Sequence, residues 1–292
     1  MRRNCRAVLT FQEVFGEAAS AESESFPWLG LCQAVFCMTT RKLLSKRGKH
    51  LQKSLLEAGL SPYVRIVVNE GAYTKACRKC STVRASCQSH AFVIDYARKL
   101  GLRLVLVLED DFYFDVPVLK ASFDAMRGFM EQDVPFSAFL LGGVYLGMRP
   151  TGLSRIFKGQ GVQAHAWILD LGHPVWSDEK TFSRFDMADI YNNVHGETYM
   201  IYPDVAFQRN FQRSEDTRSR PVYPLKQFPL LYRILTWIGL KFGMRNCWEG
   251  CARNTNFLVR YTGSLEMLLG GVVLCLAVLL FLLVQSFKAF SK

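Results

Sequence analysis

The stretch that most constrains this chain is the apolar run 104–108, which leads directly into Glu109, Asp110 and Asp111. A short continuous apolar run of this kind is typical of a strand that is buried on both faces of a parallel sheet. The acids then follow the carboxyl end of the strand, where open α/β sheets bind their ligands. Adjacent carboxylates repel each other by roughly 4 kcal/mol per pair about 4 Å apart, at an effective dielectric constant near 20. A divalent cation held by oxygen ligands would offset this repulsion, and a solvated acidic loop is the alternative.

Strand-like and helix-like segments alternate on both sides of this run. The first three segments read strand, helix, strand, which predicts a right-handed parallel crossover. The alternation as a whole predicts an α/β fold. Strands are expected at 31–38, 63–68, 104–108, 136–141, 164–169 and 198–203, and helices at 43–59, 89–100 and 116–130.

The two ends of the chain differ from this pattern. Residues 1–27 contain four glutamates and no continuous apolar run, so we expect a flexible arm rather than a signal peptide. Residues 265–287 include an uncharged apolar run at 267–284, long enough for a single membrane-spanning helix. The basic, aromatic segment 220–263 before it could lie at the lipid interface or pack on the domain.

Two further features bear on localisation. The missing signal peptide and the lack of any Asn-x-Ser/Thr acceptor favour a tail anchor in an endomembrane, with the domain facing the cytosol; a luminal domain is the alternative. The 36 basic and 25 acidic residues give a net charge of +11. This charge is not gathered in one run, and no zinc-finger, helix-turn-helix or RNA-recognition signature is present, so nucleic acid is not an expected partner.

Four local motifs, in their order along the chain, resemble glycosyltransferase family 25, whose type members act on lipooligosaccharide and on collagen. The first is Ser-Cys-Gln-Ser-His at 86–90, and the second is the strand with its Glu-Asp-Asp at 106–111. The third is Ala-His-Ala-Trp-Ile-Leu at 164–169. The fourth is Tyr-Pro-Asp-Val-Ala-Phe-Gln at 202–208, followed by Arg-Ser-Glu-Asp-Thr at 213–217.

The resemblance implies a GT-A-like α/β/α sandwich with a mostly parallel sheet over residues 28–219. It also implies an inverting hexosyltransferase that binds a nucleotide-sugar at the carboxyl ends of the strands, with Mn²⁺ or another divalent cation at the acids. Asp111 and Asp110 are the expected metal residues, and Asp110 is also expected to act in catalysis. The expected substrate-binding residues are Glu109, His165, Gln208, Ser89 and His90.

The resemblance also suggests Asp186 as the general base that deprotonates the acceptor hydroxyl. Asp186 could equally cap a helix at 187–191. His165 likewise has two readings, a donor contact or a satisfied core histidine. The chain departs from the family after its first strand, where residues 37–42 share only the basic character of an Asn-Leu and Arg-x-x-Arg element, so no diphosphate contact by Arg41 or Arg47 is carried over.

The cysteines permit a separate structural site. Cys77, Cys80, Cys87 and His90 have the spacing Cys-x2-Cys-x6-Cys-x2-His, which could hold a structural zinc ion. Reduced thiols in a cytosolic loop, or a disulfide in an oxidising compartment, are the alternatives.

The sequence thus predicts a membrane-anchored, metal-dependent glycosyltransferase that moves a sugar, galactose being one candidate, to a hydroxyl of a glycan, lipid or protein. A membrane-tethered protein that binds nucleotide-sugar or glycan without turnover is the alternative from another class. A metal-dependent phosphoesterase would need a second metal and further ligands.

Overall fold

A computed structural model describes residues 6–16, 28–69, 82–176, 196–208, 260, 263, 264, 267 and 270–280. Strands and helices alternate through most of it, so the predicted α/β fold is confirmed. The elements are β1 (Arg6–Thr10), α1 (Phe11–Phe15), η2 (Trp28–Gly30), β2 (Ala34–Thr39), α2 (Arg41–Glu57), β3 (Val64–Asn69), α3 (Thr82–Lys99), β4 (Leu104–Glu109), β5 (Phe112–Phe114), α4 (Val116–Met130), β6 (Ala138–Pro150), β7 (Ile156–Asp170), η4 (Pro174–Trp176), β8 (Thr198–Ile201) and β9 (Ala206–Gln208).

The strands form a seven-stranded sheet in the order β1-β3-β2-β4-β7-β6-β8 and a two-stranded sheet of β5 and β9. In the large sheet β2 is parallel to β3 and β4, and β6 is parallel to β8, while the other four pairings are antiparallel. The prediction of a mostly parallel sheet is therefore wrong. The reason is that β6 and β7 form a hairpin, and β7 enters the sheet next to β4 in the reverse direction.

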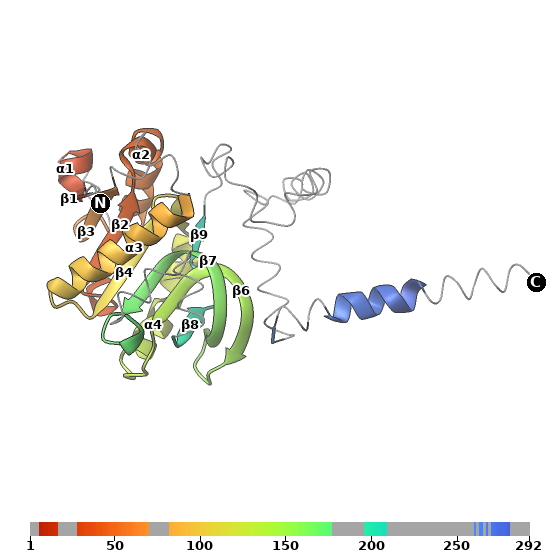
Figure 1. Ribbon diagram of the computed structural model, residues 1–292. Coiled ribbons are helices and arrows are strands. Elements are labelled where there is room, and N and C mark those ends of the chain that lie inside the picture. Colours follow the sequence, from red (N-terminus) through yellow and green to blue (C-terminus); the bar gives the residue numbers. More distant parts are fainter. Residues whose placement is uncertain are drawn as a thin grey trace, which may run out of the picture.

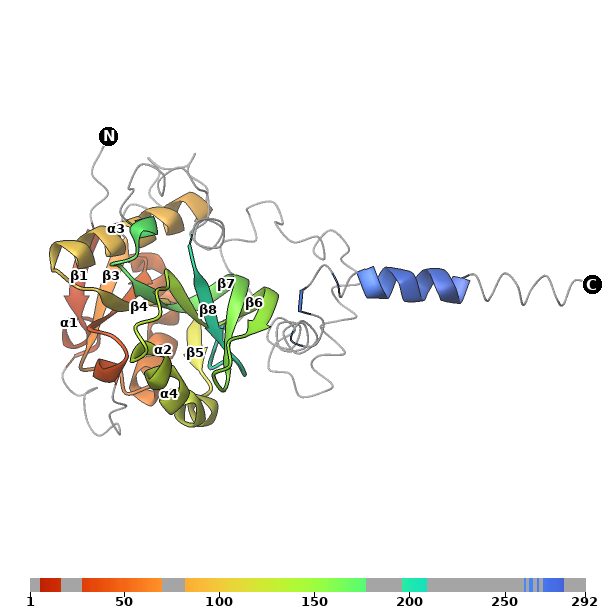
Figure 2. The same cartoon turned by 90° about the horizontal axis from the view of Figure 1, so that it is seen from below.

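Helices cover both faces of the sheet, α2 and α4 on one side and α3 on the other (Figures 1 and 2). Alternate residues of the central strands divide between two apolar clusters. One cluster contains Val35 and Leu106 together with side chains of α2 and α4. The other contains Phe36 and Val107 together with side chains of α3. The uninterrupted apolar run of β4 reflects this burial on both faces, as predicted.

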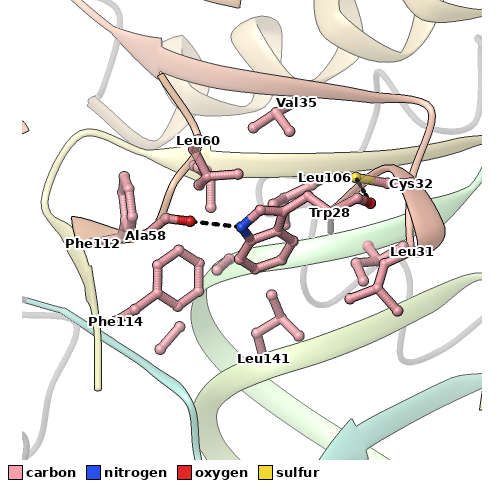
Figure 3. Packing of buried hydrophobic residues seen from close by; sticks show 14 of the residues in the cluster. Trp28, Leu31, Cys32, Val35, Ala58, Leu60, Leu106, Phe112, Phe114 and Leu141 are labelled. Carbon is pink, nitrogen blue, oxygen red and sulfur yellow. Dashed lines mark hydrogen bonds between the residues drawn. The ribbon is translucent and has the colours of Figure 1, made fainter. Parts of the chain in front are cut away.

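Trp28 anchors the cluster under α2 and α4 (Figure 3). Its side chain is fully buried, and its indole Nε1 donates a hydrogen bond of 2.7 Å to the carbonyl oxygen of Ala58. Ala58 is the C-cap residue of α2, so this bond satisfies one of the carbonyl groups that a helix end leaves without an intrahelical partner. The indole ring also packs against Phe114 and Phe123, at centroid distances of 5.4 and 6.4 Å.

The two helices on this face begin at side-chain caps. Thr40 caps α2 by accepting a hydrogen bond from the backbone N–H of Leu43, and Asp115 caps α4 in the same way through Val118. Helix α4 has the predicted bounds, whereas α2 starts two residues earlier than predicted.

The β6–β7 hairpin is longer than the two short strands predicted from the sequence. It bends where its pairing shifts register, at three points between Leu140 and Gly147, a stretch that includes Gly142 and Gly143. The bend lets β8 pair both with the start of β6 and with the start of β7. The buried Tyr145 ties the bend to β8, because its hydroxyl donates to the carbonyl oxygen of Ile201 at 3.0 Å.

Part of the predicted N-terminal arm is structured. Residues 6–10 form β1, which pairs with β3 at the edge of the sheet, and α1 follows directly. Thr10 and Glu13 make a reciprocal capping box at the start of α1. The expectation of an arm without structure is therefore wrong for residues 6–16, and residues 1–5 and 17–27 lie outside the described part.

At the C-terminus, residues 270–280 form a helix whose residues are all exposed. No helix in the described part of the chain is both long and apolar enough to cross a membrane. Of the predicted span 265–287, residues 265, 266, 268, 269 and 281–287 lie outside the described residues, as do residues 220–259, 261 and 262 of the predicted juxtamembrane segment.

Candidate functional site

The acidic turn follows the carboxyl end of β4, next to the carboxyl ends of β2 and β3. These three strands are parallel neighbours, so Thr39, Asn69 and Glu109, their last residues, lie along one edge of the sheet. Asp110 and Asp111 follow Glu109 and are both buried. The sheet edge therefore gathers polar groups from strands that are separated in the sequence.

Asp110 is held on both of its carboxylate oxygens. Oδ1 accepts a hydrogen bond of 2.7 Å from Nη1 of Arg47, and Oδ2 accepts one of 2.6 Å from the Thr39 hydroxyl. Arg47 belongs to α2, and its side chain is only 8% exposed. The conformation of Asp110 is thus fixed by Thr39 of β2 and Arg47 of α2.

Asp111 is joined to two elements through one oxygen. Its Oδ2 accepts from Nη1 of Arg47 at 3.2 Å and from Nε2 of Gln208 at 3.1 Å. Gln208 is the last residue of β9, where it pairs with Phe112 of β5. Two of the predicted site residues, 97 positions apart, are therefore in direct contact.

Glu109 faces the N-terminal half of α3. Its Oε1 lies 3.5 Å from Nε2 of His90, which makes an ion pair only when the imidazole is protonated. The His90 ring also meets Trp167 of β7 edge-on, at a centroid distance of 5.0 Å. The neighbouring Ser89 accepts a hydrogen bond of 2.8 Å from the Asn69 amide, so the predicted Ser-His motif lies against both β3 and β4.

Several predicted site residues lie wholly or partly outside the described residues. The backbone of His165 belongs to β7, one residue from Ala166, which pairs with Leu108 of β4. The side chain of His165 lies outside the described part of the structure, as do Asp186 and residues 213–217. Of the possible zinc ligands, Cys77, Cys80 and the side chain of Cys87 also lie outside it.

The sequence-based prediction missed three residues of this site: Thr39, Asn69 and Arg47. The repulsion within the acidic turn is offset in part by Arg47, a cation supplied by the chain itself. One signal could have revealed it: Arg47 falls in the helical stripe of Leu44, Leu51 and Leu55, which packs into the core. A cation in an apolar stripe needs a buried anion as its partner.

The ionisation of Asp110 reflects opposing influences. Burial, and secondly the nearby charge of Asp111, raise the pKa of Asp110 to about 7. The Arg47 guanidinium and the Thr39 hydroxyl act in the opposite direction, because both stabilise the carboxylate. Proton binding at Asp110 is therefore sensitive to any change in the cations around the turn.

The oxygen donors of the turn suit a hard divalent cation. Small cations such as Mg²⁺ are usually held by one or two carboxylates together with water and substrate phosphates, rather than by a complete protein cage. No group of three or more His, Cys, Asp or Glu side chains in metal-binding geometry occurs among the described residues. Because both oxygens of Asp110 accept hydrogen bonds, Asp111 and the partly exposed Glu109 are the better candidate ligands.

No family model matches the chain, and no significant match is found among curated proteins. The contacts around the acidic turn therefore carry the functional interpretation.

Proposed function

We propose that this chain is a metal-dependent glycosyltransferase that moves a sugar from a nucleotide-sugar donor to a hydroxyl acceptor. The observation that carries the proposal is the direct contact between Asp111 and Gln208 at the carboxyl edge of the sheet. Each residue belongs to a different motif of the resemblance to glycosyltransferase family 25. A chance likeness of two short motifs would give no reason for them to meet.

A second contact between motifs supports the same proposal. His90 comes from the Ser-His motif and lies against Glu109 of the acidic motif. The three-layer arrangement of α2, α4, the sheet and α3 is compatible with the GT-A-like fold that the resemblance implies. In that fold the donor would lie over the carboxyl ends of β2, β3 and β4, as ligands commonly do in open α/β sheets.

The roles that we propose follow from the contacts. Asp111, with Glu109, would hold the cation and through it the donor diphosphate, while Asp110 would keep the turn in place through Thr39 and Arg47. A bound divalent cation would act as a Lewis acid on the diphosphate leaving group. Gln208 fixes the orientation of the Asp111 carboxylate, because its amide donates to the same oxygen as Arg47. The proposal also includes an inverting reaction with Asp186 as the general base. This part rests only on the resemblance to glycosyltransferase family 25.

A screen of nucleotide-sugars tests the function. Purified protein is heated with each UDP-, GDP- and CMP-sugar in Mn²⁺ and again with a chelator. At about 100 times its Kd, a bound donor stabilises the native state by about 2.7 kcal/mol, which corresponds to a rise in Tm of roughly 5–10 °C. We expect this rise for one donor class, in Mn²⁺ only, followed by release or transfer of its sugar. The proposal fails if no nucleotide-sugar stabilises the protein in either condition.

A binding protein without turnover is the second candidate. The contact that favours it is the tight engagement of Asp110, which leaves fewer acidic oxygens for chemistry than the motif suggests. The same screen separates the two candidates. A binding protein would show the rise in Tm with a donor but would leave the donor unhydrolysed and untransferred after prolonged incubation with candidate acceptors.

We also propose that the chain associates with a lipid bilayer through its C-terminal apolar residues. The helix 270–280 is apolar on every side and exposed along its whole length, a character that suits a lipid environment better than water. The segment just before it is attached to the domain: Gly263 accepts a hydrogen bond of 3.1 Å from Met148 N–H, and Arg260 lies 5.3 Å from the Tyr202 ring centroid. The contacts of Arg260 and Gly263 would thus hold the start of the C-terminal segment against the domain.

Flotation with liposomes tests this association. We expect the full chain to float with liposomes of phosphatidylcholine and phosphatidylserine and to remain with them in 1 M salt, because apolar insertion is not screened by ions. A variant in which Leu274 and Leu279 are replaced by aspartate should stay at the bottom of the gradient. Flotation of both proteins alike, or of neither, would rule out this role for the helix.

A further inference from the structure

Arg47 occupies a position where an apolar residue would be expected. Helix α2 packs Leu51 and Leu55 into the core, and Leu44 lies against the same cluster. Arg47 lies between Leu44 and Leu51 on this face and is buried. Arginine is rarely buried in proteins unless its charge is paired.

The pairing of Arg47 is with the acidic turn. A single atom, Nη1, lies 2.7 Å from Oδ1 of Asp110 and 3.2 Å from Oδ2 of Asp111. All three side chains are at most 11% exposed, so water screens the interaction weakly. When its three acids are ionised the turn carries a charge of −3, and Arg47 reduces this to −2.

We propose that Arg47 is an internal counter-ion of the acidic turn that competes with a free divalent cation for Asp111. The turn would then stay folded without metal, and the cation would bind strongly only together with an anionic diphosphate. The competition between Arg47 and a divalent cation deepens the proposed metal-dependent function and rests on it. The counter-ion role of Arg47 is independent of that function.

Electrostatics gives the direction of the competition. A cation at Asp111 would lie close to the Arg47 guanidinium, and like charges a few ångströms apart in a poorly screened site repel each other strongly. A diphosphate adds negative charge on the open side of the cation and offsets that repulsion. Cation binding and donor binding should therefore be positively coupled.

A double-mutant cycle tests the counter-ion role without metal. Tm is measured with a chelator at pH 8, above the pKa of Asp110, for wild type, Arg47→Gln, Asp110→Asn and the double variant. Removing one partner of a buried ion pair is strongly destabilising, and we expect Arg47→Gln to lower Tm by roughly 10 °C. In the Asp110→Asn background the loss should be less than half as large, because one of the two paired charges is gone.

Two variants complete the cycle. Lys53→Gln is the matched control: it removes a cation from the same helix, but Lys53 is 71% exposed and pairs with Glu57 at the surface, so Tm should change little. Arg47→Lys keeps the charge and should recover at least half of the Tm loss in the wild-type background. If Arg47→Gln does not fold, the cycle is run with Arg47→Met, which also removes the charge but fills similar space with an apolar side chain. Equal losses in both backgrounds would mean that Arg47 serves only helix packing, and the proposal would be overturned.

Binding of Mn²⁺ tests the competition between Arg47 and the cation. Binding is measured as the decrease in the EPR signal of free Mn²⁺. We expect Arg47→Gln to bind Mn²⁺ alone roughly tenfold more tightly than wild type, and Arg47→Lys to bind it like wild type. If wild type binds Mn²⁺ with UDP but Arg47→Gln shows no gain for Mn²⁺ alone, the competition is overturned while the proposed function stands. If no variant binds Mn²⁺ with or without UDP, the competition is overturned together with the metal-dependent function.

Discussion

Replacement of Asp111 by asparagine should lower the rate of sugar transfer by at least about a thousandfold. Under the proposed function, Asp111 holds the cation that stabilises the diphosphate leaving group, and a metal ion at such a position supplies several kcal/mol of charge stabilisation. A loss of about 4 kcal/mol in the activation free energy corresponds to roughly a thousandfold in rate. The measurement is the turnover of the donor identified in the screen, at saturating Mn²⁺.

Asparagine is the informative substitution because it leaves the local hydrogen bonds possible. The amide oxygen of the introduced asparagine could still accept from Arg47 and Gln208, which both donate to Asp111 Oδ2. Tm in chelator should therefore stay within a few degrees of wild type, so loss of activity would not reflect unfolding. Asp124→Asn is the matched control, since Asp124 lies on the exposed surface of α4, where it pairs with Arg127. Near-normal turnover by Asp111→Asn would exclude Asp111 as the metal ligand.

The elements that the sequence predicted well are those whose signals are local. Strand β4 is buried on both faces, and its unbroken apolar run predicts this burial. Helix α4 carries its own boundaries, with Asp115 as the N-cap and Pro117 in the first turn. In both cases a few neighbouring residues suffice to determine the element.

The elements that it missed depend on distant partners. Strands β5 and β9 have three residues each, and each exists because the other lies beside it. Strand β1 likewise depends on the backbone of β3 for its inter-strand hydrogen bonds. No pattern within three to five residues carries that information, because short strands gain their stability from the pairing rather than from propensity.

The candidate site divides in the same way. The acidic turn could be found from the sequence because its three carboxylates are adjacent. Its charge compensation was harder to find, because Arg47 and Thr39 reach the turn from more than 60 residues away. The place of Arg47 in an apolar helical stripe indicates that it has a buried anionic partner, but it does not show that this partner is the acidic turn. The contact between Asp111 and Gln208 depends in turn on how β9 is held against β6.

Replacement of Gly142 by alanine should detach β9 from its place and disable the candidate site. An ideal Cβ at Gly142 would lie 1.8 Å from the carbonyl oxygen of Ala206 and 2.9 Å from its carbonyl carbon. These are backbone atoms, so no side-chain rotation can relieve the clash. The neighbouring bond from Val205 N–H to the Leu141 carbonyl oxygen, 2.9 Å long, holds the two segments at this close approach.

The expected cost follows from overpacking. Added methyl groups in packed interiors typically cost 1–3 kcal/mol, and a clash with backbone should reach about 3 kcal/mol or more, which lowers Tm by roughly 6–12 °C. Gly128→Ala is the control: a Cβ there meets nothing within 4 Å, and in the interior of α4 alanine should stabilise by roughly 0.5–1 kcal/mol. Because β9 carries Gln208, donor binding in Mn²⁺ should fall with Gly142→Ala even at temperatures where the protein is still folded. A Gly142→Ala protein with the Tm and donor affinity of wild type would show that β9 does not need this approach to bring Gln208 to Asp111.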